Sequence, residues 1–254
     1  MSSENTTSQA HSLDLALAAE IQAALLPKEC PKDCAHQVAA ARNRMCGSVG
    51  GDFYDFIRAN QDQIVLVIGD VVGHGVRAAL VMARIMGFLH SKPPSLTRPH
   101  DMLTLLNRML IDLGQQTNSV LPCTMFYAVL DAPTGASFFV NTGHPRPFIC
   151  DQDRCISLEA GPGNMLLGVE EFEPEEGCHT FTPGQRLVLY TDGITDADNG
   201  SDQRFGQSRF HEVVNAHSKA PPDRCADAVF QAVDAFRGQS PQSDDETIVV
   251  IDRV

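Results

Sequence analysis

A run of branched apolar residues that ends in a carboxylate constrains this fold more than any other feature of the sequence. Residues 65–68 read Val-Leu-Val-Ile, Gly69 and Asp70 follow them, and Gly73-His74-Gly75 leads into a helical pattern. A short apolar run bounded by turn residues predicts a buried strand. A carboxylate at the end of such a strand would stand at the edge of a sheet, where it can face a ligand. Asp70 is therefore the first candidate site residue.

Three other places in the chain carry an acidic residue in a similar setting. Asp52 follows two glycines, and Asp192 stands between an apolar run and a glycine. Asp244 and Asp245 come just before the last apolar run of the chain. Any one of these aspartates alone could be an ordinary turn or cap residue. Together they predict that several carboxylates converge at one edge of a sandwich.

Clustered carboxylates repel one another, by roughly several kcal/mol at about 4 Å and an effective dielectric constant near 20. A hard divalent cation such as Mg²⁺ or Mn²⁺ removes this repulsion, because it binds oxygen ligands and keeps several waters. Two such ions about 3.5–4 Å apart suit the hydrolysis of a phosphate ester. The sequence has no Gly-x-Ser-x-Gly, His-Glu-x-x-His or Gly-x-x-x-x-Gly-Lys-Ser/Thr motif. We therefore expect metal-assisted hydrolysis without a side-chain nucleophile.

Two histidines stand in turn-like settings near these motifs. His74 lies between two glycines, and His144 lies in Thr-Gly-His-Pro. His74 could be a turn residue bonded to the backbone, or it could orient the metal site or donate a proton to the leaving group. The same two alternatives apply to His144, with the structural one favoured.

The order of the predicted elements indicates an α+β fold, an antiparallel β-sandwich flanked by helices. Long hairpins and paired helices, rather than strict alternation of strand and helix, support this class. Residues 1–12 are expected to be a disordered tail, and residues 13–27 an amphipathic helix that ends at Pro27. That helix could simply cover the core, or it could mediate dimers or receive a signal. Residues 28–254 are expected to form one catalytic domain, with helices over 77–90, 101–113, 208–216 and 224–236, and strands over 37–41, 63–68, 124–130, 136–141, 186–190 and 247–251.

Charge, hydropathy and cysteine content exclude some classes of protein. The net charge of −13 argues against a nucleic-acid surface. No apolar run approaches the ~18 residues of a membrane span, and no signal peptide is recognised, so we expect a soluble cytoplasmic protein. The eight cysteines are then expected to be reduced thiols. Cys30 and Cys34 form at most a weak half of a zinc site.

The ordered set of motifs resembles the SpoIIE/RsbU-type branch of the metal-dependent PPM protein phosphatases. The resemblance is collinear from about Ala19 to the C-terminus. The motifs that carry it are Leu-Leu-Pro (25–27), Gly-Gly-Asp-Phe-Tyr-Asp (50–55), Gly-Asp-Val-Val-Gly-His-Gly (69–75), Gly-His-Pro (143–145), Leu-Tyr-Thr-Asp-Gly-Ile-Thr-Asp-Ala (189–197), Phe-Gly (205–206) and Asp-Asp-Glu-Thr (244–247).

This resemblance implies a centre of two Mn²⁺ or Mg²⁺ ions that activates water to hydrolyse phosphoserine or phosphothreonine on proteins. It implies that Asp70 bridges both ions and that the backbone carbonyl of Val71 is a further ligand. Asp52 would belong to the second ion. The first ion would be held by Asp192 and Asp244, with Asp245 as the alternative to Asp244.

The resemblance also implies partners. In this branch the substrate is typically a phosphorylated anti-anti-sigma factor with a STAS domain, within a bacterial partner-switching pathway. An upstream activator or sensor would act through the N-terminal helix, which could also form a homodimer. Two alternatives stay open: a non-catalytic module that binds partners of the same pathway, and a metal phosphoesterase that acts on small molecules.

Overall fold

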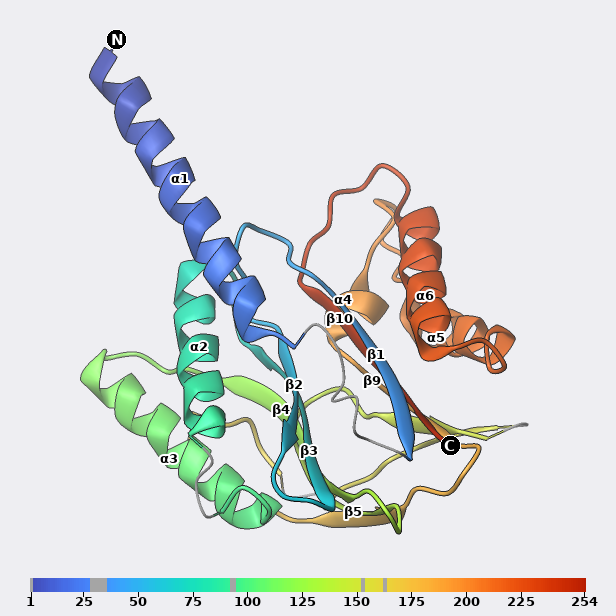
Figure 1. Ribbon diagram of the computed structural model, residues 1–254. Helices are drawn as coiled ribbons and strands as arrows, with labels where there is room; N and C mark the ends of the chain where they lie inside the picture. The colour runs from blue at the N-terminus through green and yellow to red at the C-terminus, as the bar shows by residue number, and fades with distance from the viewer. Residues whose placement is uncertain (1, 28–35, 92–94, 152–153, 162–163) are drawn as a thin grey trace.

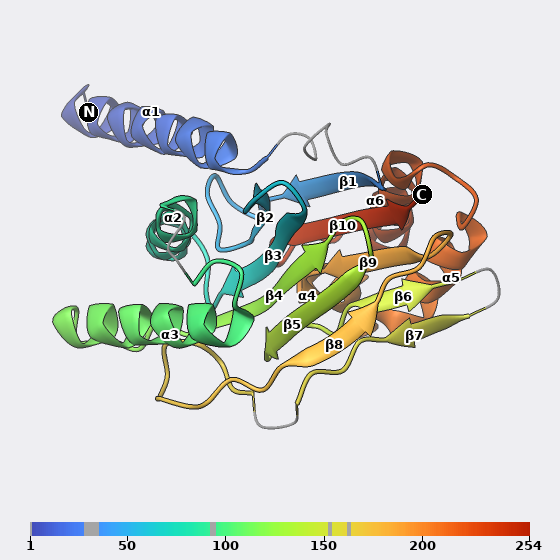
Figure 2. The same ribbon diagram turned by 60° about the horizontal axis from the view of Figure 1, so that its bottom comes forward.

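Two five-stranded antiparallel sheets form the body of the protein (Figures 1 and 2). The computed structural model describes residues 2–27, 36–91, 95–151, 154–161 and 164–254, and side chains from residue 13 onward. The first sheet has the strand order β1 (Gln37–Arg44), β10 (Glu246–Arg253), β9 (Arg186–Tyr190), β6 (Phe148–Cys150) and β7 (Cys155–Ser157). The second has the order β2 (Phe53–Arg58), β3 (Gln63–Val71), β4 (Cys123–Asp131), β5 (Ala136–Thr142) and β8 (Gly177–Thr180).

Helices lie on the outer side of each sheet, so the predicted sandwich flanked by helices is confirmed (Figure 1). The second sheet carries α2 (Val76–His90) and α3 (Pro99–Gln116), and the first carries α4 (Asp192–Asp196), α5 (Gly206–Ala216) and α6 (Pro222–Arg237). The N-terminal helix α1 (Ser2–Leu25) passes α2 and extends beyond the sandwich.

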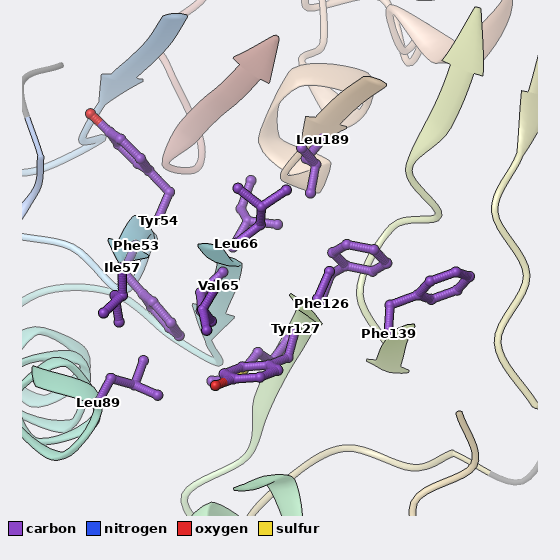
Figure 3. Close-up of a cluster of buried hydrophobic side chains, with 14 of the residues drawn as sticks. Phe53, Tyr54, Ile57, Val65, Leu66, Leu89, Phe126, Tyr127, Phe139 and Leu189 are labelled. Carbon is purple, nitrogen blue, oxygen red and sulfur yellow. The ribbon is translucent and has the colours of Figure 1, made fainter. Parts of the chain in front are cut away.

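Successive side chains of a strand point to opposite faces of its sheet, so one strand contributes to two core layers. Leu187 and Leu189 of β9 belong to the large apolar cluster that contains Leu66 of β3 and Phe126 of β4. Figure 3 shows Leu189 facing these residues, whereas Leu89 of α2 approaches Ile57 and Val65 from the other side of the second sheet. Val188 and Tyr190 point the opposite way and pack in a separate cluster with residues of α5 and α6. Each strand of the centre is thus buried on both faces, which explains its continuous apolar run.

The expected disordered tail is wrong for residues 2–12, which continue α1 to Ser2. Residues 2–12 contain no Gly or Pro to interrupt a helix that has already formed from residue 13 onward. Extending an existing helix costs much less than nucleating one, so a polar segment can join it. The helix ends at Leu25, just before Pro27, as expected.

Cysteine pairing also differs from the expectation. Cys150 and Cys155 are opposite residues in the β6–β7 hairpin and form a disulfide. The short hairpin brings the two side chains together, which a spacing of five residues did not reveal. Cys46, Cys123, Cys178 and Cys225 are free thiols. Cys30 and Cys34 lie outside the described residues, so the zinc half-site is untested. Among the helices that the structure describes, none is long and apolar enough to cross a membrane.

Candidate metal centre

Four strand termini bring the acidic motifs to one edge of the sandwich. Asp52 directly precedes β2, and β2 pairs with β3 so that Phe53 lies opposite Gly69, the neighbour of Asp70. Asp192 follows β9 and Thr191. The backbone N–H of Thr191 donates to Thr247 O in β10, and Thr247 stands two residues after Asp245. Strand pairing therefore brings the acidic motifs together within each sheet, and hydrogen bonds from Thr191 and Thr247 to Asp52 join the two sheets at this edge.

The carboxylates lie close enough to change one another's ionisation. Burial raises the pKa of Asp70 to about 7, and the charges of Asp192, Asp244 and Asp245 add to this rise. Burial and then the charge of Asp70 raise the pKa of Asp52 well above its ordinary value. Burial followed by like-charge repulsion likewise raises the pKa of Asp192. Ionising these carboxylates together is therefore unfavourable, and a bound cation would offset their repulsion.

Asp52 is fixed by two threonines. Its side chain is 1% exposed, and its Oδ2 accepts hydrogen bonds from Thr191 Oγ1 at 2.8 Å and Thr247 Oγ1 at 2.5 Å. The two threonines stand beside Asp192 and two residues after Asp245, so the acidic motifs also supply the groups that orient Asp52. In the sequence, only the place of these threonines within two acidic motifs indicates this role.

Asp245 holds the backbone of the loop that carries Asp52. Its Oδ1 accepts the N–H of Cys46 at 2.7 Å, and its Oδ2 accepts the N–H of Gly51 at 2.7 Å. The side chain is 3% exposed. Asp244, in contrast, is exposed and accepts the N–H of Asp245 at 2.8 Å. Of this pair, Asp244 has the more suitable carboxylate for a metal, and Asp245 supports the loop.

Glycines keep the space beside Asp70 open. A Cβ on Gly51 would lie 2.5 Å from the carbonyl oxygen of Val71 and 3.0 Å from Asp70 Oδ1. A Cβ on Gly193 would clash with the backbone carbonyl of Asp245. Any larger residue at position 51 would fill the space next to the carboxylate and carbonyl oxygens. Glycine is therefore required at positions 51 and 193, because the neighbouring atoms lie too close for a Cβ.

The donor set fits a hard divalent cation. The candidate ligand groups are carboxylate oxygens and the carbonyl oxygen of Val71, the ligand type that Mg²⁺ and Mn²⁺ prefer. Within the described part of the chain, no three acidic, cysteine or histidine side chains are gathered tightly enough to enclose an ion by themselves. Water would therefore complete the shell of each ion, since Mg²⁺ commonly keeps several waters.

His74 lies at the rim of the acidic cluster. It is exposed in the turn between β3 and α2, where Gly73 and Gly75 have φ values of 100° and 77°. Its charge lowers the pKa of Asp244, whereas burial has the larger, opposite effect. The position is compatible with both alternatives raised from the sequence, turn residue and participant in the reaction.

His144 has the structural environment that the sequence favoured. It is 4% exposed, and its Nδ1 lies 3.0 Å from Thr124 Oγ1. Burial lowers the pKa of His144 to about 3, so the ring is neutral. A neutral buried ring beside β4 supports the strand and does not supply a cation.

The N-terminal helix touches the loop of Asp52 directly. Gln22 of α1 donates from Nε2 to Gly50 O at 2.7 Å and accepts at Oε1 from Gly50 N at 3.0 Å. The Gln22 side chain is 5% exposed. Gly51, the next residue, is bonded to Asp245. Gln22 has no distinguishing signal in the sequence, because the amphipathic pattern of this helix describes only its apolar positions.

Known proteins are similar to this chain in sequence. The family described as Stage II sporulation protein E (SpoIIE) matches residues 60–254. The phosphoserine phosphatase RsbU of Bacillus subtilis (strain 168) is 26% identical over 194 residues, which cover 75% of this chain and 56% of RsbU. This chain spans about half the length of the curated relatives that it matches.

Solved structures show the same architecture. The SiaA-PP2C domain of Pseudomonas aeruginosa superposes with a TM-score of 0.84 at 21% identity, and the match covers 100% of both chains. RsbX in complex with magnesium superposes with a TM-score of 0.62 at 13% identity, covering 87% of this chain and 96% of RsbX. Since the family match spans most of the sequence, the chain belongs to the SpoIIE family, the SpoIIE/RsbU-type branch of the PPM phosphatases.

Proposed function

We propose that this chain is a Mn²⁺- or Mg²⁺-dependent serine/threonine protein phosphatase. One observation carries the proposal: Asp52, Asp70, Asp192 and Asp244 meet at one edge of the sandwich, and the pKa of each is raised. A structural ion-pair network would lower carboxylate pKa values instead. The phosphoserine phosphatase activity named for RsbU supports the same reaction class.

Each residue has a proposed role. Asp70 would contribute to both ions, Asp52 to the second, and Asp192 and Asp244 to the first, while the Val71 carbonyl would add an oxygen ligand. Bound Mn²⁺ or Mg²⁺ supplies a water of lowered pKa and offsets the charge of the phosphoryl oxygens. Asp245, Thr191 and Thr247 keep Asp52 in place through the hydrogen bonds described above.

The proposed substrate is a phosphorylated STAS-domain anti-anti-sigma factor. The similarity to RsbU and RsbP, both named phosphoserine phosphatases, supports a place in a partner-switching pathway. The proposed route of regulation is α1, because Gln22 links this helix to the loop of Asp52. An activator that moves α1, or a second copy of the chain paired through it, would act on that loop.

The test is phosphate release from phosphoserine-containing STAS proteins of the same genome. The wild type is assayed with Mn²⁺ and with a chelator, and Asp70→Asn with Mn²⁺. Asp112→Asn is the matched control, because Asp112 is an exposed acid on α3. We expect turnover only for the wild type and Asp112→Asn with Mn²⁺.

Equal rates in all conditions would contradict the proposal. Partner binding without turnover at any Mn²⁺ concentration, unchanged in Asp70→Asn, would indicate the non-catalytic binding module instead. Turnover of nucleotides far above that of phosphoproteins would indicate a small-molecule phosphoesterase.

A further inference from the structure

A polar pocket of about 520 Å³ adjoins the acidic cluster. Asp192 and Thr195 of α4 form the wall that it shares with the candidate metal centre. The remaining wall comes from the turn after β5, from β7 and from the start of α5, including Arg146, Ser157, Gln207 and His211. A substrate whose phosphoryl group reaches Asp192 would therefore have its adjoining atoms at the mouth of this pocket.

Arg146 is the cation of the pocket. It is the only Lys or Arg among the described lining residues. His144 in the floor is neutral because burial lowers its pKa to about 3, and burial also lowers the pKa of His211, whose ring packs 4.4 Å from that of Phe148. In a chain with a net charge of −13, a guanidinium beside an acidic reaction centre offers a contact for a negatively charged substrate.

The guanidinium of Arg146 can exchange its present partner, Glu159, for another carboxylate. Its Nη1 lies 3.0 Å from Glu159 Oε1, in an ion pair whose side chains are 64% and 69% exposed. Exposed pairs of this kind contribute little net free energy, because water solvates both charges. A carboxylate from a bound molecule can replace Glu159 at small cost.

The backbone that carries Arg146 is held rigidly. Asn141 donates from Nδ2 to His144 O at 3.0 Å and accepts from His144 N at 2.8 Å. Gly143 has a φ of 72°, and Pro145 fixes the next backbone angle. A preorganised turn lowers the entropy lost when Arg146 engages a ligand.

We propose that this pocket binds the polypeptide flanking the phosphorylated residue, and that Arg146 recognises an acidic side chain of that segment. Neutral hydrogen-bonding groups such as those of Ser157, Thr195 and Gln207 suit a peptide backbone and its polar side chains. The inference rests on the proposed phosphatase function and names the feature that selects its substrate.

The test uses synthetic phosphoserine peptides in which Glu or Lys is placed in turn at each of the three positions on either side of the phosphoserine. The kcat and KM for each peptide and for p-nitrophenyl phosphate are measured with Mn²⁺ for the wild type, Arg146→Ala and Arg146→Glu. Peptide binding is followed separately by fluorescence anisotropy. Arg108→Ala is the matched control, because Arg108 is 63% exposed and also sits near a glutamate, Glu171, at 3.9 Å.

We expect the wild type to show a lower KM for Glu than for Lys at one or more positions. Arg146→Ala should raise the KM of the preferred peptide about tenfold, the effect of one charged contact, with kcat nearly unchanged. Arg146→Glu should reverse the preference. Turnover of p-nitrophenyl phosphate, which has no flanking chain, should be unaffected by either change, and Arg108→Ala should behave as the wild type.

A Glu preference that survives Arg146→Ala, or no preference at any position, would overturn the inference. An equal loss of activity toward p-nitrophenyl phosphate would also overturn it, because Arg146 would then act on the reaction centre. Absence of all turnover, combined with peptide binding that still depends on Arg146, would contradict the phosphatase proposal alone.

Discussion

At the scale of single residues, the two neighbouring aspartates before β10 have different environments. Asp245 is buried and accepts two backbone N–H groups, whereas Asp244 is exposed. We expect Asp245→Asn to lower the free energy of unfolding by about 2–3 kcal/mol. The amide NH₂ group would replace one carboxylate oxygen and would face a backbone N–H donor without an acceptor. Asp244→Asn, the matched variant, should leave stability nearly unchanged and reduce Mn²⁺-dependent turnover. Urea unfolding and phosphatase assays of both variants check this, and equal stability losses would contradict it.

The raised pKa of Asp70 gives a second prediction, for the protein without metal. Asp70 has a pKa of about 7 in the folded chain and an ordinary value near 3.8. Between these values the folded state binds more protons than the unfolded state, so the contribution of Asp70 to stability falls as pH rises. Chelator-treated protein should therefore have a higher Tm at pH 5 than at pH 7.5.

Two comparisons isolate the cause of that trend. Asp70→Asn should reduce it, since the amide does not titrate, whereas Asp52, Asp192 and Asp244 still contribute. Mn²⁺ should weaken or reverse it, because the ion competes with protons for the carboxylates. A metal-free wild type whose Tm falls no more between pH 5 and pH 7.5 than that of Asp70→Asn would contradict this electrostatic explanation.

At the scale of elements, the apolar runs predicted most strands and helices correctly. β3, β4, β5, β9 and β10 all include the ranges expected from their branched and aromatic residues. The strand β2 was not predicted, because the two glycines before Asp52 drew attention to a turn rather than to the strand that follows. The polar strand β8 has no apolar pattern, and only its pairing with β5 defines it.

The sequence could give the acidic residues as candidates for the site, but not the separate role of each residue or the residues that support them. Strand-end positions give Asp52, Asp70, Asp192 and the pair Asp244–Asp245 as candidates from sequence alone. The support given by Thr191, Thr247 and Gln22 depends on contacts between segments 28 to 195 residues apart. No local pattern encodes such contacts.

The contact between α1 and the loop of Asp52 leads to a third prediction. Gln22→Ala should raise the Mn²⁺ concentration for half-maximal activity by about tenfold, a typical effect of removing a group that orients a metal ligand. Glu20→Ala is the control, because Glu20 is exposed on the same helix. Titration of activity with Mn²⁺ measures the shift. An unchanged Mn²⁺ dependence in Gln22→Ala would show that α1 does not position the loop.

At the scale of the whole molecule, α1 leaves apolar side chains without cover. Leu13, Leu17 and Ile21 are 62%, 49% and 66% exposed, and Leu80 of the neighbouring α2 is 67% exposed. Figure 1 shows α1 extending past the sandwich, where a second copy could reach it. We expect the chain to associate as a homodimer through this helix, consistent with the apolar surface.

Charge placed on that surface should separate the copies. Leu17→Glu combined with Ile21→Glu should convert a dimer to a monomer in light scattering coupled to size-exclusion chromatography. Phe138→Glu is the control, since Phe138 is 53% exposed on β5 of the second sheet. A wild type that stays monomeric at high micromolar concentration would contradict dimerisation through α1.

The central claim is that the converging carboxylates hold the ions that make hydrolysis possible. Its most direct test counts Mn²⁺ bound at equilibrium, by calorimetric titration, to the wild type, Asp70→Asn and the control Asp112→Asn, with turnover measured on the same samples. We expect two ions in the wild type and the control. We expect fewer ions in Asp70→Asn, with turnover lower by at least about 100-fold. Full Mn²⁺ occupancy with unchanged turnover in Asp70→Asn would contradict the central claim.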